Sequence, residues 1–348
     1  MEEIKLTHFS HGGGCGCKIA PQVLDVILKG NEAQNHFPNL IVGNSGRDDA
    51  AVIELNGQAL ISTVDFFAPI VDDPEEFGRI AAANALSDIY AMGGKPLLAI
   101  AILGWPVKKI APELAGLVVK GAMSICSEAG IPLAGGHSID SPEPIFGLSV
   151  NGIAPLTHIK KNNTAKAGDL LFLTKRLGTG VLGTAIKRGL ITPEDHVAVV
   201  KSMCTLNKAG EQFGKLNYIS AMTDVTGFGL LGHLVEMTEG SNLVAEIKFS
   251  EIPIFANVEN YIKQMCFPDN TYKNWNAVEN KVSGIEGTSF IMLCDPQTSG
   301  GLLVAVHPDH ADEFIVEARN QGIPEELLHP IGKLNSVKEG ESIRIKVS

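Results

Sequence analysis

A glycine-rich segment near the start of the chain carries two cysteines and a lysine at a spacing that suits thiol chemistry. Residues 12–18 read Gly-Gly-Gly-Cys-Gly-Cys-Lys, so Cys15 and Cys17 lie two apart and Lys18 follows them directly. The thiolate is the nucleophilic form of cysteine, and a neighbouring ammonium group favours it. The glycines would let the segment fold over a bound substrate and open again. The alternative is an unordered tail whose cysteines have no role.

Several aspartates gather around the first predicted strands and the helix that follows them. Asp48 and Asp49 precede the first strand, and Asp65 ends its hairpin partner. Asp88 lies on the next helix and shares a helix face with Asn84. Carboxylates on one surface repel one another unless a cation joins them, and Mg²⁺ prefers such oxygen ligands and bridges to substrate phosphates. The alternative, turn residues and a solvated helix face, is weakest for Asp65 and Asp88, which adjoin apolar residues.

Glycine-rich turns offer backbone N–H groups that could hold phosphate. One is Ala134–Ser138 and another is Thr223–Gly229, which leads into a helix. His137, in the first turn, could equally be a structural histidine. A third turn, Asp295–Gly301, is predicted to be structural, because its proline and glycines suffice to explain it.

The sequence gives little support to the two standard nucleotide-binding motifs, the P-loop and the dinucleotide-binding fingerprint. Gly93-Gly94-Lys95 is followed by proline and lacks the leading glycine of a P-loop. Residues 178–183 match G-x-G-x-x-G, but no βαβ unit with an acidic strand end clearly follows. Dinucleotide binding is therefore disfavoured.

The elements that must position these residues alternate between strand and helix in the first half of the chain. Asn56-Gly57 joins two apolar runs and predicts a hairpin. Asp73-Pro74 opens a helix that ends at Gly93-Gly94. The predicted elements are a helix at 21–28, strands at 51–55 and 59–64, a helix to Met92, a strand at 97–103, a helix at 112–129 and a strand at 145–153.

A polar and basic stretch, Pro155–Gly168, marks the predicted boundary to a second domain. Its predicted elements are a strand at 170–174, a long helical stretch near 194–213, a helix after Gly227, a strand at 243–249 and a paired strand-turn-strand around 295–301. Residues 264–288 look irregular and are predicted to form a loop. The apolar hairpin 51–64 and strand 97–103 would leave edges that invite pairing, which predicts a homodimer.

Composition excludes several function classes. The 348 residues suffice for two domains, 45% of them are hydrophobic, and the formal net charge of −11 argues against binding nucleic acid or a membrane surface. The longest nearly apolar run, 96–107, is too short to span a bilayer, and the first residues lack the layout of a signal peptide. We therefore expect a soluble, cytoplasmic protein without a disulfide framework.

Taken together, these motifs resemble the selenophosphate synthetase (selenide, water dikinase) family, within the aminoimidazole ribonucleotide synthetase-like superfamily. The resemblance covers nearly the whole chain, and its Cys-Gly-Cys-Lys segment is specific to the selenium branch. The stretches that carry it are residues 10–18, 47–52, 63–67, 84–96, 135–140, 223–229 and 295–301.

The resemblance implies a two-domain α+β fold in which the N-terminal domains of two subunits join their sheets into a barrel-like dimer core. The implied division is a flexible catalytic segment at 1–48, an ATP- and Mg²⁺-binding dimerisation domain at 49–156 and a C-terminal α+β domain at 168–348.

The implied reaction converts ATP, selenide and water into selenophosphate, AMP and phosphate, and supplies the selenium donor for selenocysteine and selenium-modified tRNA. Cys15 and Lys18 match the family's catalytic residues, and Asp49, Asp88 and Asp224 match ligands for several Mg²⁺ ions. A monovalent cation such as K⁺ is a further candidate cofactor. The positions matching ATP contacts are Lys18, Gly46, Arg47, Asp48, Asp65, Asp88, Gly136, His137 and Ser138.

Two alternatives remain open from the sequence. The first is an ATP-dependent synthase or kinase of the same superfamily with another acceptor, such as a purine precursor or thiamine phosphate. The second is a non-catalytic thiol-based carrier of selenium or metal, which would leave the spaced aspartates unexplained.

Overall fold

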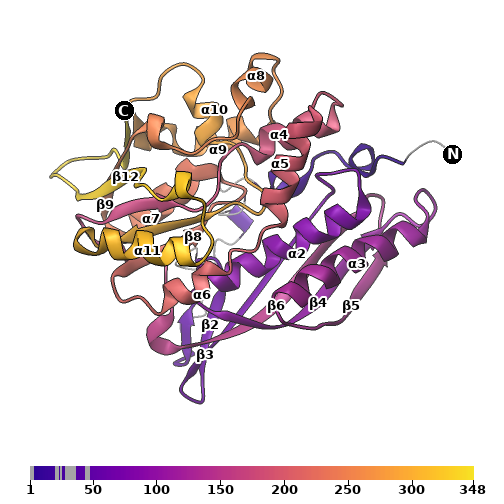
Figure 1. The fold of residues 1–348 in the computed structure, drawn as a ribbon, viewed down its shortest axis with the longest axis horizontal. Coiled ribbons are helices and arrows are strands. Elements are labelled where there is room, and N and C mark those ends of the chain that lie inside the picture. The colour runs from indigo at the N-terminus through magenta and orange to yellow at the C-terminus, as the bar shows by residue number, and fades with distance from the viewer. Residues whose placement is uncertain (1–3, 20–22, 24–25, 28–36, 44–47) are drawn as a thin grey trace.

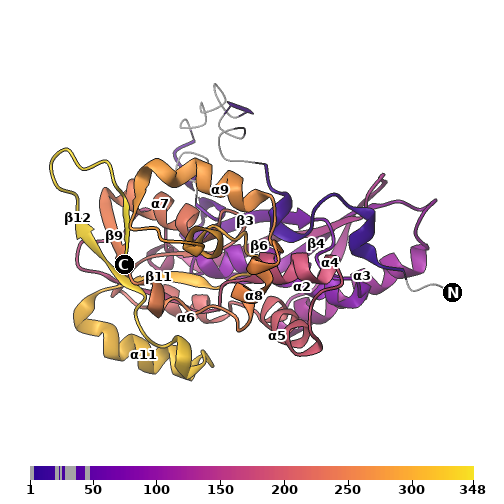
Figure 2. The ribbon, with the colours of Figure 1, turned by 90° about the horizontal axis from the view of Figure 1, so that it is seen from above.

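Two mixed α and β units lie side by side in the computed structural model, which describes residues 4–19, 23, 26–27, 37–43 and 48–348 (Figures 1 and 2). The first contains a six-stranded sheet in the order β1-β2-β3-β6-β4-β5. Its strands are β1 (Leu40–Val42), β2 (Ala51–Leu55), β3 (Gln58–Phe67), β4 (Lys95–Trp105), β5 (Leu133–Asp140) and β6 (Ile145–Pro155). Short 3₁₀ turns cover Leu6–Phe9, Gly14–Cys17 and Leu156–His158.

The hairpin between β2 and β3 forms where the sequence predicts it. Asn56 and Gly57 both have positive φ, 53° and 80°, as a two-residue hairpin turn of this kind requires. Leu55 pairs with Gln58 across the turn. This register carries Asp65 to the far end of β3, next to the N-terminal segment.

Helix α2 (Pro74–Ala91) is the central helix of the molecule. The Asp73 carboxylate accepts a hydrogen bond from Glu76 N at 2.8 Å and caps the predicted start, and Gly93 takes a left-handed φ of 75° just beyond the end. Nearly all residues from Phe77 onward are buried, because α2 contacts its own sheet, helix α3 (Pro112–Glu128) and strand β8 (Ile219–Asp224) of the second unit. Polar side chains on α2 are therefore held inside the protein.

The second unit contains a seven-stranded sheet in the order β10-β13-β9-β12-β7-β11-β8. Its strands are β7 (Leu170–Leu173), β8 (Ile219–Asp224), β9 (Leu243–Ile247), β10 (Val282–Ser283), β11 (Leu302–Val306), β12 (Gly332–Ser336) and β13 (Ile345–Val347). Its helices are α4 (Thr179–Lys187), α5 (Pro193–Cys204), α6 (Ala209–Gly214), α7 (Gly229–Ser241), α8 (Val258–Lys263), α9 (Asn270–Val278), α10 (Ser289–Leu293) and α11 (Ala311–Asn320). None of the helices in the described part of the chain has the length and hydrophobicity needed to cross a bilayer.

Several local predictions for this unit are wrong. The helix predicted at 194–213 is broken between α5 and α6, where the Asn207 side chain donates hydrogen bonds to Ser87 Oγ and Gly300 O. Residues 264–288 contain helix α9 and strand β10 rather than a loop. The predicted strand-turn-strand around 295–301 has a strand only on its C-terminal side, since α10 precedes it. The predicted helix at 21–28 lies largely outside the described residues.

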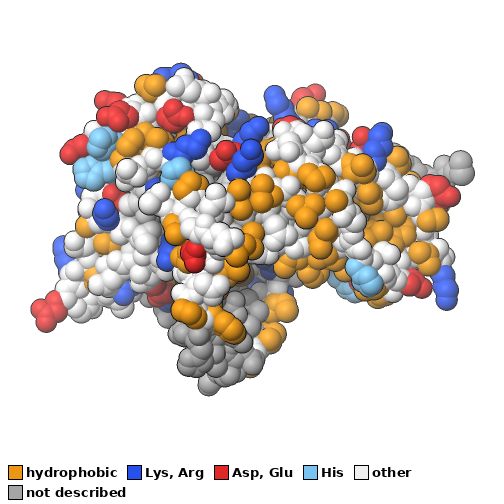
Figure 3. Space-filling view, turned by 90° about the horizontal axis from the view of Figure 1, so that it is seen from below, with side chains coloured by type: hydrophobic (Ala, Val, Ile, Leu, Met, Phe, Trp, Pro, Cys, Tyr) orange, Lys and Arg blue, Asp and Glu red, His pale blue; other side chains and the backbone are white. Residues whose placement is uncertain are grey.

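One face of the first sheet is left uncovered. Helices α2 and α3 pack on the other face, while large apolar side chains such as Val64 and Phe66, each about half exposed, stand on the open one. Figure 3 shows apolar side chains gathered over this half of the molecule. The prediction that strand 97–103 has an open edge is wrong, because β4 lies between β6 and β5.

Candidate active site

A cluster of buried and half-buried carboxylates lies where α2 passes between the two sheets. Asp88 comes from α2, Asp65 from β3 and Asp224 from the end of β8, and Asp49 lies just before β2. Asp88 and Asp224 are 7% and 2% exposed. The cluster therefore joins residues from both units, with α2 as the shared support.

Hydroxyl groups orient three of these carboxylates. Thr223 Oγ1 donates to Asp49 Oδ1 at 2.7 Å, and Ser87 Oγ donates to Asp224 Oδ2. Asp88 Oδ2 accepts a hydrogen bond from the hydroxyl of Thr63. Each of the three carboxylates is thus held through one of its oxygens.

Burial and mutual repulsion make the cluster electrostatically strained. Burial, followed by the charge of Asp224, raises the pKa of Asp49 well above its usual range, and burial and Asp65 do the same for Asp88. Burial raises the pKa of Asp224 to about 6, although the Ser87 hydroxyl opposes the shift. Such shifts are typical of functional sites. A cation bound among the carboxylates would oppose them, because an opposite charge favours the ionised form.

The donor set fits a hard cation. Asp49 Oδ2 is buried and has no hydrogen-bond partner among the described residues. As the described side chains stand, no three acidic, histidine or cysteine groups lie at the spacing of ligands to one ion. Aspartate oxygens are ligands that Mg²⁺ prefers, and it usually keeps several waters in its remaining positions.

The glycine-rich segment brings Cys15 and Lys18 against this cluster. Cys15 is 1% exposed, its N–H donates to Thr298 Oγ1 at 2.9 Å, and its thiol donates to Asn84 Oδ1 at 3.3 Å. Lys18 Nζ lies 3.4 Å from Asp65 Oδ1. The cysteine and the lysine predicted to be catalytic are therefore beside the carboxylates.

The protonation of the two groups follows from this placement. Burial raises the pKa of the Cys15 thiol above its ordinary value, and the nearby Lys18 charge only partly opposes this. Burial alone would lower the pKa of Lys18, but the charges of Asp65 and its neighbours reverse the effect and raise it. Burial thus favours the protonated thiol of Cys15, and the surrounding carboxylates favour the charged form of Lys18.

Asn84 links these groups and is a functional candidate that the predicted site omits. Its Oδ1 accepts hydrogen bonds from the Cys15 thiol and from Ser299 N at 2.7 Å, and its Nδ2 donates to Asp65 Oδ2 at 2.7 Å. Ser299 takes a left-handed φ of 49°, a strained conformation of the kind found at functional sites. The sequence signal for Asn84 is its position one turn before Asp88; Thr298 and Ser299 gave none beyond a glycine-rich turn.

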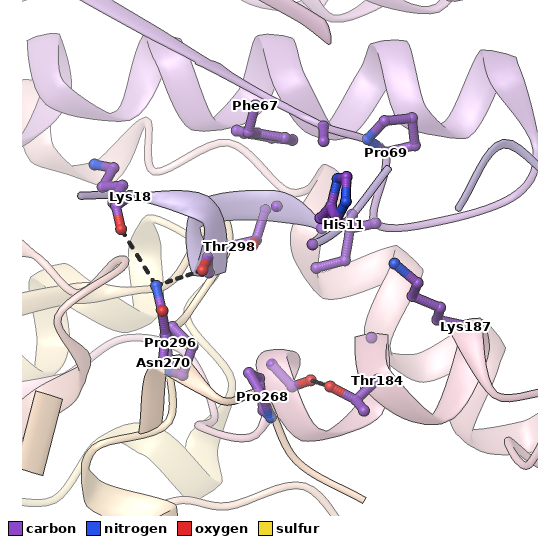
Figure 4. Close-up of a pocket in the computed structure, with 18 of the residues that line it drawn as sticks. His11, Lys18, Phe67, Pro69, Thr184, Lys187, Pro268, Asn270, Pro296 and Thr298 are labelled. Carbon is purple, nitrogen blue, oxygen red and sulfur yellow. Dashed lines mark hydrogen bonds between the residues drawn. The ribbon is translucent and has the colours of Figure 1, made fainter. Parts of the chain in front are cut away.

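A cavity of about 1250 Å³ opens beside the segment (Figure 4). Lys18, Asp65 and Phe67 line one part of it, and Thr184 and Lys187 of α4 line another. It is large enough for a nucleotide-sized ligand.

Other predicted ATP contacts lie elsewhere. Gly136, His137 and Ser138 belong to the exposed edge strand β5, so the turn predicted at 134–138 is a strand instead. These three residues do not line this cavity. Strand β5 pairs with β4 in an extended conformation because a shift in register between Ala99 and Ala101 of β4 accommodates the glycines of β5. Gly46 and Arg47 lie outside the described residues.

Asp48 has a structural partner, and the chain's own side chains fill the G-x-G-x-x-G turn. Asp48 Oδ1 accepts a hydrogen bond from Asn162 N at 2.8 Å, and burial raises the pKa of the Asp48 carboxyl. At the start of α4, Gln297 Oε1 accepts from Gly178 N and Thr179 N, and Asp295 Oδ2 accepts from Gly180 N. The N–H groups that would hold a dinucleotide phosphate are therefore already used.

Known proteins resemble this chain over its full length. The family models for AIR synthase related protein match residues 47–154 (N-terminal domain) and 166–344 (C-terminal domain). The selenide, water dikinase of Aeromonas hydrophila is 53% identical over 346 residues, with 99% of each chain covered. That of Pseudomonas aeruginosa is 54% identical over 347 residues, also with 99% of each covered.

Solved structures of lower identity share the fold. Thiamine monophosphate kinase from Aquifex aeolicus superposes with a TM-score of 0.65 at 17% identity, covering 94% of this chain and 96% of that one. Hydrogenase maturation protein HypE in complex with ATP gives a TM-score of 0.64 at 18% identity, covering 99% and 94%. The family models and the full-length relatives establish that the chain belongs to the AIR synthase related family and, within it, to the selenide, water dikinases.

Proposed function

We propose that this protein makes selenophosphate from selenide, ATP and water and releases AMP and phosphate. The observation that carries the proposal is the position of Cys15 and Lys18, which contact Asn84 and Asp65 at the carboxylate cluster. This position joins the part of the sequence specific to selenium chemistry to a site suited to polyphosphate. The full-length relatives named selenide, water dikinase support the same activity.

In the first chemical step, a bond forms between selenium and the γ-phosphorus of ATP. The bond from that phosphorus to the oxygen that bridges the β- and γ-phosphates breaks, and ADP leaves. Such transfers depend on positioning and charge neutralisation more than on covalent chemistry. Lys18, charged and 35% exposed at the cavity, supplies a positive charge to the phosphates. Docking of the segment also keeps water from competing with selenide.

Asp49, Asp88 and Asp224 are the proposed Mg²⁺ ligands, and Asp65 is a proposed nucleotide contact that also holds Lys18. Bound Mg²⁺ would neutralise the polyphosphate charge. A monovalent cation such as K⁺ is part of the proposal, without an assigned site.

The second step hydrolyses ADP, with water attacking the β-phosphorus and AMP leaving. Water must reach the site for this step, so the segment has to move during turnover. Opening would also return Cys15 to solvent, where its thiol ionises more readily than in its buried position. The proposed role of Cys15 is that of the thiol that handles selenium.

The proposed assembly is a homodimer formed through the uncovered face of the first sheet. Val64 and Phe66 stand on that face and would be buried by a second copy. Gly136, His137 and Ser138 remain proposed nucleotide contacts, and since they lie away from the cavity of their own subunit, they would act across this interface.

The division into a catalytic segment at 1–48 and domains at 49–156 and 168–348 also remains a proposal. We place the reaction in the cytoplasm, where a free Cys15 thiol stays reduced.

Phosphorus NMR of the protein with ATP, Mg²⁺ and selenide under anaerobic conditions tests the function. The expected result is equimolar selenophosphate, phosphate and AMP. ADP as the final nucleotide would indicate a kinase with another acceptor. Selenium binding without any ATP consumption would indicate a carrier.

A further inference from the structure

An amide side chain of helix α9 contacts the catalytic segment. Asn270, the first residue of α9, is 9% exposed, and its Nδ2 donates hydrogen bonds to the carbonyl oxygens of Gly16 and of Lys18, the latter at 3.3 Å (Figure 4). An amide nitrogen has two N–H donors. Both donors of Asn270 are therefore used on the catalytic segment.

These bonds complete a closed turn. Lys18 N donates to Cys15 O at 3.2 Å on one side, and Asn270 joins the carbonyls of Gly16 and Lys18 on the other. The backbone from Cys15 to Lys18 is thus constrained at both ends. The directions of the thiol toward Asn84 and of the ammonium group toward Asp65 follow from that backbone.

The same helix holds the loop that follows Asp224. Asn274, one turn after Asn270, donates from Nδ2 to Gly227 O at 2.9 Å and to Cys294 O at 3.0 Å. The segment lies directly on this loop, since a Cβ at Gly227 would meet Cys15 O at 2.8 Å and Lys18 Cδ at 2.9 Å. Helix α9 therefore sets the segment and the loop beyond Asp224 relative to each other.

We propose that Asn270 is a positioning residue that holds the segment so that Cys15 and Lys18 face the carboxylate cluster. It acts through the segment backbone and donates none of its hydrogen bonds to the carboxylates. Its effect on turnover rests on the proposed function, whereas its effect on Cys15 accessibility does not. A substrate-free measurement therefore tests the positioning separately from the reaction.

The variants are Asn270→Ala, which removes both donors, and Asn270→Asp, which places carboxylate oxygens against two carbonyl oxygens. The matched control is Asn276→Ala, an exposed asparagine on the same helix. The probe is iodoacetamide, with mass spectrometry following alkylation of each cysteine separately. Cys204 and Cys294 are buried outside the catalytic segment and report on general loosening of the fold.

For Asn270→Ala we expect Cys15 alkylation to accelerate about thirtyfold, the factor for two lost hydrogen bonds of average net strength. For Asn270→Asp we expect at least as much, and for Asn276→Ala no change. Cys204 and Cys294 should keep their wild-type rates. With substrates, kcat for AMP formation should fall by a similar factor while the KM for ATP changes little.

If Cys15 is alkylated at the wild-type rate in both Asn270 variants, the proposal is overturned. Parallel acceleration at Cys204 and Cys294 would also overturn it, because Asn270 would then support the fold in general. If the wild-type protein forms no AMP, the proposed function fails, and the alkylation rates still decide the positioning role. Accelerated alkylation with unchanged kcat would show that Asn270 does not position the segment for catalysis.

Discussion

Replacing Gly14 by alanine should prevent the catalytic segment from docking while leaving the domains folded. Gly14 has a left-handed φ of 56°, and an added Cβ would lie 2.7 Å from Ile70 Cδ1 and closer still to Thr298 Oγ1. Alanine in that backbone conformation costs roughly 1–2 kcal/mol, and forced overlap in a packed site about 1–3 kcal/mol more. Docking is therefore disfavoured by about 2–5 kcal/mol, or roughly thirtyfold to several thousandfold.

The neighbouring Gly16 provides the comparison. A Cβ there would meet only Pro296 Cγ, at an ordinary contact distance of 3.6 Å. We expect Gly14→Ala to lose most AMP formation and to expose Cys15 to iodoacetamide, with a thermal midpoint close to that of the wild type. Gly16→Ala should show a much smaller effect in both assays. Equal activity and equal Cys15 protection in the two variants would refute the docked geometry as the active arrangement.

Three further predictions follow from the site and the sheet. Asp224→Ala should abolish AMP formation. Without metal, the wild-type protein should lose stability as pH rises from about 4 to about 6, because the raised pKa of Asp224 in the folded state lets the native protein bind the proton more tightly than the unfolded chain does. Thermal midpoints measured in chelator that stay constant over that pH range would contradict the shift. Cys15→Ser should abolish selenophosphate formation and Lys18→Ala should abolish ATP cleavage, whereas Cys17→Ser should retain substantial activity. Selenophosphate and AMP are assayed separately for each variant, beside thermal melts. Loss of activity in Cys17→Ser alone would show that Cys17, and not Cys15, is the catalytic thiol. Light scattering should give a dimer that Phe66→Asp dissociates, and a stable wild-type monomer of 37.0 kDa would exclude the proposed interface.

The active-site arrangement shows how far residue types can identify a site without giving its geometry. The aspartates could be grouped from their positions at strand ends and on α2, since each element places its side chains with a fixed period. Asn84 and Asp88 share a helix face for the same reason. The sequence could not show that the Cys15 N–H bonds to Thr298, because 283 residues separate the two and their contact depends on the packing of two domains.

What the sequence by itself determined is the local structure with strong short-range causes. Asn56-Gly57 specifies the hairpin because few residues adopt its positive φ angles, and Asp73-Pro74 starts α2 because a carboxylate cap and a preset φ favour that point. The motif that marks Cys15 and Lys18 as chemical residues is likewise contiguous in the chain.

Only the tertiary structure decided the conformation of segments in which contacts with residues far away in the chain outweigh local preference. The glycines at 135–136 favour a turn locally, yet pairing with β4 holds them in an edge strand. Helix α9 lacks a clear sequence signal, and in the structure Asn270 and Asn274 tie it to carbonyl groups of the catalytic segment and of the loop after Asp224. Hydrogen bonds between residues far apart in the chain exist only after the domains have packed, so no window of sequence contains them.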